Sequence, residues 1–349
     1  MAKKMEQESG DNSQNFQVAG NLIVGVSAAE ARQIAIDVFK ANFYDFSEKA
    51  AKIALERAEE ITDNFIEQFY SKIPHLEEKL QEPSVQSTMF NTQKEYAKTG
   101  DKVLKDQLLD LLIKRIDSEE RSLKQIVLDE AITIIPKLTQ DQINVLTLIF
   151  SAVNYNHRDI LNIPSFVNFI NNKILRFFPE TELSFSFFTH LQFTGCCTIL
   201  PEGSSYKPFD EIIKNRLQAL FSKGFTEEQL TAEFGEDKNK LRMMLMRCLQ
   251  NPLLQQFNPL NEDVFKSKIQ EHNLGQLGDK ALNFSNRYSM NAGELQEYLK
   301  RINPRMERFL TSWKEKDFKT IRPTSVGFAI AVLNYNRVTG SNIPIESFI

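Results

Sequence analysis

The sequence predicts a mainly α-helical protein, because two kinds of pattern recur along its 349 residues. Apolar residues return every three or four positions, and helix-start signals precede several of these runs while proline or glycine ends them. The clearest start lies at residues 138–143, where Thr139 can cap a helix and Gln142 can reach back to the cap. Leu138 can pack on Ile143 as a hydrophobic staple. We expect the rest of the fold to be arranged around this helix.

A repeated ending is the second organising feature. The tripeptide Asn154-Tyr155-Asn156 returns as Asn334-Tyr335-Asn336. At the same offset, Asn162-Ile163-Pro164 returns as Asn342-Ile343-Pro344. Two helices are therefore predicted to end in the same way. Matches of three residues do not distinguish a duplication from chance.

A short β-hairpin is predicted near the N-terminus. Residues 15–26 carry β-forming side chains around a Gly20-Asn21 turn, after a polar stretch over residues 1–14. An isolated hairpin is marginal in water, so this one either lies on its own chain or pairs with copies of itself. The residues that such self-assembly would use are Phe16, Val18, Leu22, Ile23 and Val24.

Helices account for most of the remaining chain, and three parts are expected. Residues 1–26 form the polar tail and hairpin, residues 27–120 a helical N-terminal region, and residues 121–349 a helical domain. In the N-terminal region, helices are predicted from the capping box Ser27–Glu30, from Ser47 to about Ile73, from Ser84 to Ala97 and from Asp101 to about Ile116.

The domain over residues 121–349 combines helices with a short strand. The stretch 183–195 is interpreted as a helix stopped by Gly195, although Leu183, Phe185 and Phe187 also alternate as in a strand. The predicted strand is Cys196–Leu200. The other predicted helices are Leu123–Ile135, Pro208–Phe221, a capping-box helix from Thr226 to Gly235, Leu241–Leu249, Glu262–Glu271, Lys280–Tyr288, Ala292–Ile302, Pro304 to about Lys314, and one that opens at Pro323–Gly327.

The overall charge excludes a global field that would recruit nucleic acid or an anionic membrane. There are 42 Lys and Arg residues against 46 Asp and Glu residues, a formal net charge of -4. Three cysteines, of which Cys196 and Cys197 are adjacent, fit a reducing compartment. The first ten residues lack the apolar core of a signal peptide, and no run reaches the roughly 18 apolar residues of a membrane span. We expect a cytoplasmic protein.

Motifs for nucleotide or metal chemistry do not stand out. The sequence holds neither a G-x-x-x-x-G-K loop nor a G-x-G-x-x-G loop after a strand, and its four histidines lack metal-ligand spacing. We expect no cofactor and no metal. A nucleophilic pair of His190 with Cys196 or Cys197 is conceivable across the helix end, but cysteines of this kind are more often small buried hydrophobes.

The segment with the strongest local charge is residues 300–322. It contains eight basic residues and three acidic ones, an excess of five positive charges. Phosphates of nucleic acid or lipid headgroups are one possible partner. A solvated face, or pairing with glutamates of the same chain, is the alternative. The candidate anion-binding residues are Arg301, Arg305, Arg308, Lys314, Lys316, Lys319 and Arg322.

The 27 phenylalanines are spaced mostly as core residues of helices. Two adjacent pairs are different, because neighbouring positions on a helix point in different directions and one ring of each pair can stay half exposed. The candidate partner surface therefore comprises Phe177, Phe178, Phe187 and Phe188.

Three pieces of the chain resemble an uncharacterised bacterial group related to the abortive-infection alpha proteins. They are Lys137–Gln142 followed by Leu146, Phe188–Gly195 followed by an apolar strand, and Pro323–Gly327 with its helix. The resemblance implies a winged-helix-like arrangement and a role in protecting bacteria against phage, and it supplies no catalytic residues. The chain departs from the pattern at Cys196-Cys197 and in its long helical front over residues 28–116.

A second resemblance concerns the polar N-terminal residues. Gly10–Ser13, with Gln17 and Gly20-Asn21, resembles a short tail on assorted bacterial defence proteins. Together these features lead us to expect a binding protein without an active site, which senses or transmits phage infection through contacts with a second protein subunit or a phage component. If the hairpin pairs with copies of itself, the protein forms a homo-oligomer. Two alternatives stay open: a nucleic-acid-binding module using residues 300–322, and a hydrolase with a site assembled by the fold from cysteine and histidine.

Overall fold

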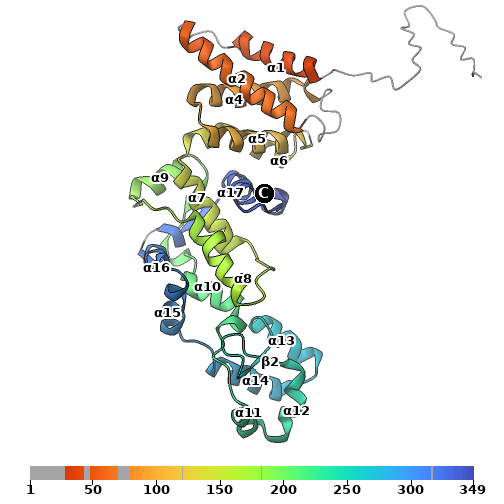
Figure 1. The fold of residues 1–349 in the computed structure, drawn as a ribbon, viewed down its shortest axis with the longest axis vertical. Coiled ribbons are helices and arrows are strands. Elements are labelled where there is room, and N and C mark those ends of the chain that lie inside the picture. The colour runs from red at the N-terminus through yellow and green to blue at the C-terminus, as the bar shows by residue number, and fades with distance from the viewer. Residues whose placement is uncertain (1–27, 43–47, 70–78, 120, 182, 316) are drawn as a thin grey trace, which may run out of the picture. The chain divides into compact units, whose positions relative to one another are not determined.

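The computed structural model describes residues 28–42, 48–69, 79–119, 121–181, 183–315 and 317–349 (Figure 1). These residues are mainly helical, as the sequence predicts. The chain divides into two compact units, Met1–Gly100 and Asp101–Ile349. The division thus falls at Gly100 and not at residue 120, because the helix that follows packs within the second unit. The predicted hairpin over residues 15–26 lies outside the described residues.

In the described part of the first unit, three helices pack on one another: α1 (Ala28–Asn42), α2 (Glu48–Phe69) and α4 (Pro83–Thr99). Their core combines Phe39 with three alanines, and these small side chains let the helices approach closely. A buried amide ties the three together, since Gln93 Nε2 donates to Ala35 O at 3.2 Å and to Thr62 Oγ1 at 2.9 Å. The Arg57 guanidinium donates to the carbonyl of Ala97 near the end of α4.

The second unit is built around α7 (Gln140–Ile149), the helix with the clearest start signal. Its predicted capping box is confirmed, with Thr139 Oγ1 accepting from Gln142 N and Gln142 Oε1 accepting from Thr139 N. The C-terminal helix α17 (Ser325–Thr339) lies along α7 and also contacts α5 (Lys102–Ile116) and α6 (Leu123–Ile134). A buried hydrogen bond of 2.9 Å from Asn334 Nδ2 to Thr147 Oγ1 fixes α17 on α7.

Two π-helical turns extend helices of the second unit, one after α7 and one after the next helix along the chain. After α7 the chain forms a π-helix at Phe150–Asn154, and α8 (Ile163–Phe169) continues into a second π-helix at Ile170–Ile174 and a 3₁₀ turn at Leu175–Phe177. The prediction of two equal helix endings is wrong. The chain becomes extended at Tyr155 after the π-turn, whereas α17 continues through Asn334–Asn336 and ends at the left-handed Gly340.

The stretch that follows is the helix α9 (Phe185–Phe193), so the strand alternative for residues 183–188 is excluded. Gly195 follows it with a φ of 76°, a left-handed conformation that suits glycine at a helix end. The predicted strand forms as β1 (Cys197–Ile199) and pairs antiparallel with β4 (Ile321–Pro323), with Cys197 opposite Pro323. This pairing brings the start of α17 beside the end of α9.

A separate core lies among the elements between α10 and α15 (Figure 1). It is built on Phe225, Phe257, Phe284 and their apolar neighbours. The region begins with α10 (Phe209–Arg216) and a 3₁₀ turn at Gln218–Phe221. The core residues come from the chain that follows, which contains α11 (Glu227–Phe234), α12 (Lys238–Leu241), β2 (Leu245–Arg247), β3 (Gln255–Phe257), α13 (Glu262–Glu271) and α14 (Gly275–Arg287).

Two helices predicted in this region are corrected. The helix predicted over Leu241–Leu249 is wrong, because β2 pairs antiparallel with β3 there and tertiary pairing overrides a short apolar period. The helix predicted from Pro208 to Phe221 ends at Arg216, and a 3₁₀ turn follows. The last two helices of the region, α15 (Ala292–Ile302) and α16 (Arg305–Glu315), lie close to their predicted positions and both contact α10.

Helix length and hydropathy determine whether a helix could cross a membrane. Among the described residues, no helix combines the length and the apolar character that crossing a membrane requires.

Replacing Gly327 by alanine is expected to destabilise the second unit. A Cβ at this position would lie 1.9 Å from the carbonyl oxygen of Cys196, a backbone atom that cannot move aside. Overpacking of this kind costs roughly 1–3 kcal/mol of unfolding free energy. Urea unfolding followed by circular dichroism measures the change. The matched control is Gly293→Ala, whose Cβ would meet its nearest atom at 3.5 Å and which should be neutral or slightly stabilising. Equal stability of the two variants would contradict the close approach.

Candidate functional site

A groove of about 650 Å³ lies between α10, α15 and α16 in the second unit. Its base is apolar and buried, formed by Phe209, Leu295 and Trp313, while Leu310 is half-buried beside them. Charged side chains from all three helices surround this base. An apolar floor with a few polar groups is the usual composition of a binding site. The groove is therefore the candidate functional site.

Aromatic packing makes the groove floor rigid. The rings of Phe209 and Phe309 meet edge to face with centroids 4.8 Å apart, and Trp313 packs on both at 5.7 Å. The indole Nε1 of Trp313 donates to the carbonyl of Lys207 at 3.2 Å. The polar atom of Trp313 is satisfied inside the protein, and the ring supports the floor of the groove from an almost completely buried position.

The three helices that form the groove are each held by local chemistry. The capping box of Asn291 with Glu294 starts α15, and Asn303 Oδ1 accepts from Arg305 N at the start of α16. At the other end of α10, the guanidinium of Arg216 donates to the carbonyls of Ala152 and Val153. These carbonyls belong to the π-helix after α7, so α10 is fixed to the central helix.

A buried carboxylate, Asp210, lines the groove in the first turn of α10. Its residue is only 7% exposed, and its Oδ2 accepts from Gln296 Nε2 at 2.8 Å. No ion pair to Asp210 occurs within the described part of the chain. The nearby lysines are used elsewhere, since Lys214 Nζ donates to Met290 O at 2.6 Å and Lys300 pairs with Glu297 at 3.1 Å.

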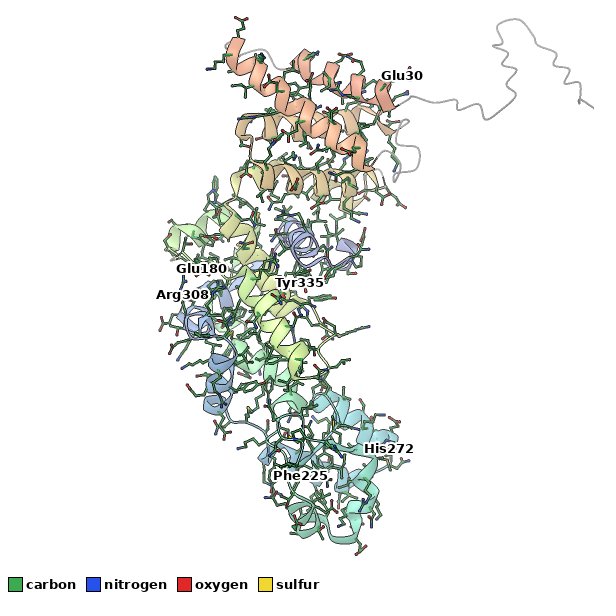
Figure 2. The ribbon with its side chains drawn as sticks, in the orientation of Figure 1. Glu30, Glu180, Phe225, His272, Arg308 and Tyr335 are labelled. Carbon is green, nitrogen blue, oxygen red and sulfur yellow. The ribbon has the colours of Figure 1, made fainter. Side chains whose placement is uncertain are left out.

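Two of the predicted anion-binding arginines pair with a glutamate of the same chain. Arg305 lies 2.5 Å from Glu180 and also donates to the carbonyl of Phe178. Arg308 lies over the Phe178 ring, donates to Thr181 O at 2.8 Å and points toward Glu180 (Figure 2). The alternative weighed for the basic segment, pairing with its own glutamates, thus applies to these two arginines.

The other members of the basic segment are scattered. Arg322 stacks over the Tyr206 ring at 3.2 Å and donates to Ser204 O at 2.6 Å. Lys319 is half-buried, and Arg301 is exposed. Lys314 is exposed and lines the groove, whereas Lys316 lies outside the described residues. Of the members of this set that the structure describes, only Lys314 lies at the candidate site.

The predicted partner surface of phenylalanines is mostly interior. Phe177, Phe178 and Phe188 are each exposed by 3% or less, so their assignment to a surface is wrong, and Phe187 is half-buried. Exposed rings do occur on the same helix, with Phe193 exposed by 86% and Phe185 by 77%. Their positions follow from the helical period, because they lie on the face of α9 opposite Phe188 and Leu191. The five candidate self-assembly residues between Phe16 and Val24 lie outside the described residues.

The cysteine and histidine candidates do not form a nucleophilic pair. Cys196 and Cys197 are both buried, and burial raises the pKa of both thiols, that of Cys197 to about 12. A reactive cysteine needs the opposite shift, which stabilises the thiolate. His190 is exposed, and its Nδ1 lies 3.0 Å from the side-chain amide of Gln142. Among the described residues there is also no cluster of three or more potential metal ligands.

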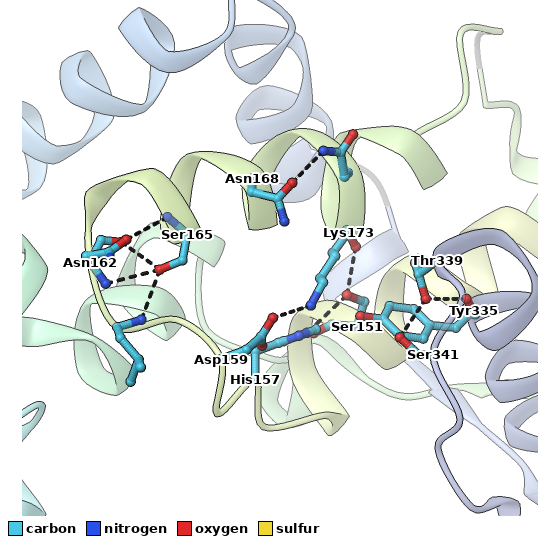
Figure 3. Close-up of polar contacts among 12 residues, drawn as sticks. Ser151, His157, Asp159, Asn162, Ser165, Asn168, Lys173, Tyr335, Thr339 and Ser341 are labelled. Carbon is cyan, nitrogen blue, oxygen red and sulfur yellow. Dashed lines mark hydrogen bonds and ion pairs between the residues drawn. The ribbon is translucent and has the colours of Figure 1, made fainter.

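A second polar cluster joins the two π-helical turns (Figure 3). His157 Nε2 donates to the carbonyl of Ser151 at 2.9 Å, and Ser151 Oγ donates to the carbonyl of Lys173 at 2.7 Å. The carboxylate of Asp159 pairs with Lys173 and not with the imidazole. Because the serine proton points to a carbonyl and the histidine Nε2 already carries a proton, these groups are not arranged as a catalytic triad. They hold the two turns together.

Stability is expected to fall in acid through His157, which sequence reasoning did not single out. Burial lowers its pKa to about 4, so the folded protein binds fewer protons than the unfolded chain between pH 4 and 6.5. The contribution of His157 to the free energy of unfolding is fully present above pH 6.5 and is lost as pH falls toward 4. The loss amounts to roughly 2 kcal/mol between pH 7 and pH 5.

The measurement is urea unfolding at both pH values. His157→Asn should be less stable overall but should lack this part of the pH dependence, and the exposed His190→Asn should keep it. Asp110, whose pKa burial raises to about 6, acts in the opposite direction in all three proteins, so the difference between variants is the quantity to compare. A wild-type pH profile that His157→Asn leaves unchanged would refute the assignment.

Comparison with known proteins gives one match. A protein-family model with the printed description ":-like" matches residues 25–349. No curated protein and no solved structure matches the chain. The family description names no activity, and it adds no residue roles to the groove. Because the match covers most of the chain, the protein belongs to the family described as ":-like".

Proposed function

We propose that this chain is a non-enzymatic binding protein of bacterial antiphage defence, which receives a segment of another protein in the groove of α10, α15 and α16. The observation that carries the binding role is the groove itself. Its floor is apolar, its rim is charged, and three helices line it. Grooves between helices are a recurrent way to receive the apolar face of a partner segment.

The defence role rests on the resemblance to abortive-infection alpha proteins. In the structure, the pieces that carry this resemblance lie together. The capping box at Thr139 starts α7, the residues around Gly195 lead into β1, and Pro323–Gly327 leads from β4 into α17. Since β1 pairs with β4 and α17 packs on α7, the three pieces form one connected part of the second unit.

We further propose that residues 209–257 form the winged-helix-like element. Its helices follow in the order α10, α11 and α12, and the β2–β3 hairpin comes last. An isolated bridge from Phe225 to Gln255 adds a third extended segment beside β3. Helices followed by a hairpin, with an additional segment between the first two helices, give the order of a winged-helix module.

A cytosolic location is part of the proposal. All three cysteines, Cys196, Cys197 and Cys248, are free and buried. Unpaired thiols fit a reducing compartment.

Nucleic-acid binding is the second candidate, and one observation favours it. Lys240 is exposed on α12, Arg242 on the 3₁₀ turn that follows it, and Arg247 on β2. In helix-turn-helix proteins the second helix of the motif enters the major groove of DNA. However, Lys240 pairs with Asp237, so part of this positive charge is neutralised. Binding that weakens steeply as salt increases would favour this candidate over a protein partner.

Filling the groove is expected to abolish protection against phage. Thr311 is exposed on α16 and lines the groove, so Thr311→Tyr places an aromatic ring where a partner would lie. The chain is expressed in a bacterial host that is challenged with a panel of phages, and plaque counts are measured. Wild type should reduce plaque formation by at least tenfold for one or more phages, and the variant should restore it.

The matched control is Thr133→Tyr, the same substitution at an exposed threonine of α6 outside the groove. It should protect as well as wild type. Immunoblots confirm equal protein levels. Wild-type chain that protects against no phage removes the defence assignment, and full protection by Thr311→Tyr removes the groove from the mechanism.

A further inference from the structure

We propose that the groove binds a segment of a partner protein that carries an arginine or lysine among apolar residues, and that Asp210 binds the cation. This inference rests on the proposed function and specifies the chemistry of the partner. It follows from the juxtaposition of a buried carboxylate with an apolar groove that supplies no cation to it.

The burial of Asp210 is the first step. A carboxylate removed from water costs several kcal/mol unless it is paired or accepts enough hydrogen bonds. Asp210 is 7% exposed and accepts one side-chain hydrogen bond, from Gln296 to Oδ2. The N-terminal turn of α10 offsets part of the cost. Within the described residues, no hydrogen bond reaches Oδ1, which leaves it available to a ligand.

The engagement of the nearby lysines is the second step. Lys214 and Lys300 both line the groove, but their ammonium groups point to other acceptors. Lys214 donates to the carbonyl of Met290, and Lys300 lies between Glu297 and Glu307 at 3.1 and 3.5 Å. The chain thus keeps its own cations away from Asp210, so the compensating charge has to come from outside.

The rest of the groove indicates what accompanies the cation. The lining holds four carboxylates against three lysines, but Glu211 pairs with Lys207, and Glu307 lies 3.5 Å from Lys300. Asp210 and the exposed Glu315 are therefore the carboxylates that attract a basic partner and repel an acidic one. Leu310 and the buried floor supply apolar contacts. A segment with an arginine or lysine next to leucine-like residues complements both properties. An arginine or lysine stem adds to the apolar contact, because its methylene groups pack on the floor while its head reaches the carboxylate.

Trp313 provides a direct measurement, because it is the only tryptophan in the sequence and it lines the groove. The full-length chain is titrated with two synthetic helical peptides, one with leucine and arginine at positions four apart and one with glutamate in place of each arginine. Tryptophan fluorescence reports occupancy. The arginine peptide should bind saturably and at least tenfold more tightly than the glutamate peptide.

Asp210→Asn is the decisive variant, since it keeps the shape of the side chain and removes its charge. It should weaken binding of the arginine peptide by roughly tenfold to a hundredfold, the range expected for one hydrogen bond to a charged group. The matched control is the neighbouring Glu211→Gln, which lies on the exposed rim and should change affinity less than threefold. Thermal unfolding without peptide checks that both variants fold, and the arginine peptide should raise the melting temperature of wild type and of Glu211→Gln only.

Three other outcomes overturn the proposal in different ways. Equal binding of both peptides, unchanged in Asp210→Asn, refutes the cationic partner but leaves a binding groove. No binding of either peptide to wild type refutes the partner chemistry, and the plaque assay of Thr311→Tyr then decides whether the groove functions at all. A chain lacking residues 1–27 that binds the arginine peptide more than tenfold tighter than the full chain would identify the occupant as a segment of the same chain.

Discussion

The packing of α17 on α7 is the contact on which the second unit depends. It joins the last long helix of the chain to the helix with the clearest start signal, across almost two hundred residues. At its start, α17 also passes close to the backbone of Cys196, where Gly327 lacks a side chain. The strand β4, which precedes α17, pairs with β1. The two ends of the segment between these strands therefore lie side by side.

The groove inherits its geometry from this arrangement. Arg216 fixes the end of α10 to the carbonyls that follow α7, and Arg305 and Arg308 fix α16 to Glu180 and its neighbours. Arg305 and Arg308 belong to the predicted anion-binding set, and all three arginines connect segments far apart in the chain. The positive charge of Arg305 and Arg308, which the sequence pattern offers to an external anion, serves in the structure to position α16. The partners of these arginines lie outside the groove lining, so the contacts hold α10 and α16 without filling the groove.

Much of the helical fold could be predicted from the sequence, because its signals are local. Capping residues such as Thr139, Thr226 and Asn291 act on backbone groups within one turn, so their effect does not depend on the rest of the fold. The helix predicted over residues 241–249 fails for the converse reason. Its apolar spacing fits a helix, but the β2–β3 pairing that decides the outcome involves residues farther along the chain.

The candidate site was less accessible to sequence reasoning. The pairs Phe177-Phe178 and Phe187-Phe188 were assigned to the surface from adjacency alone, yet neighbours from other helices bury both rings of the first pair and one ring of the second. The residues that form the groove come from three helices separated by up to a hundred positions. No local pattern marks Asp210 as buried, because it looks like an ordinary acidic residue in a first helical turn.

The two π-helical turns have a consequence for how the chain can vary. Each such turn accommodates one residue more than an α-helix does, as the bond from Tyr155 N to Phe150 O shows. The turns at Phe150–Asn154 and Ile170–Ile174 lie against each other, and Ser151 of one donates to the backbone of the other. Loss of the extra residue from either turn would rotate the remainder of that helix by about 100° and withdraw its half of the contact. The lengths of these two segments are therefore constrained by the same contact, because a deletion in either one removes that segment's part of it.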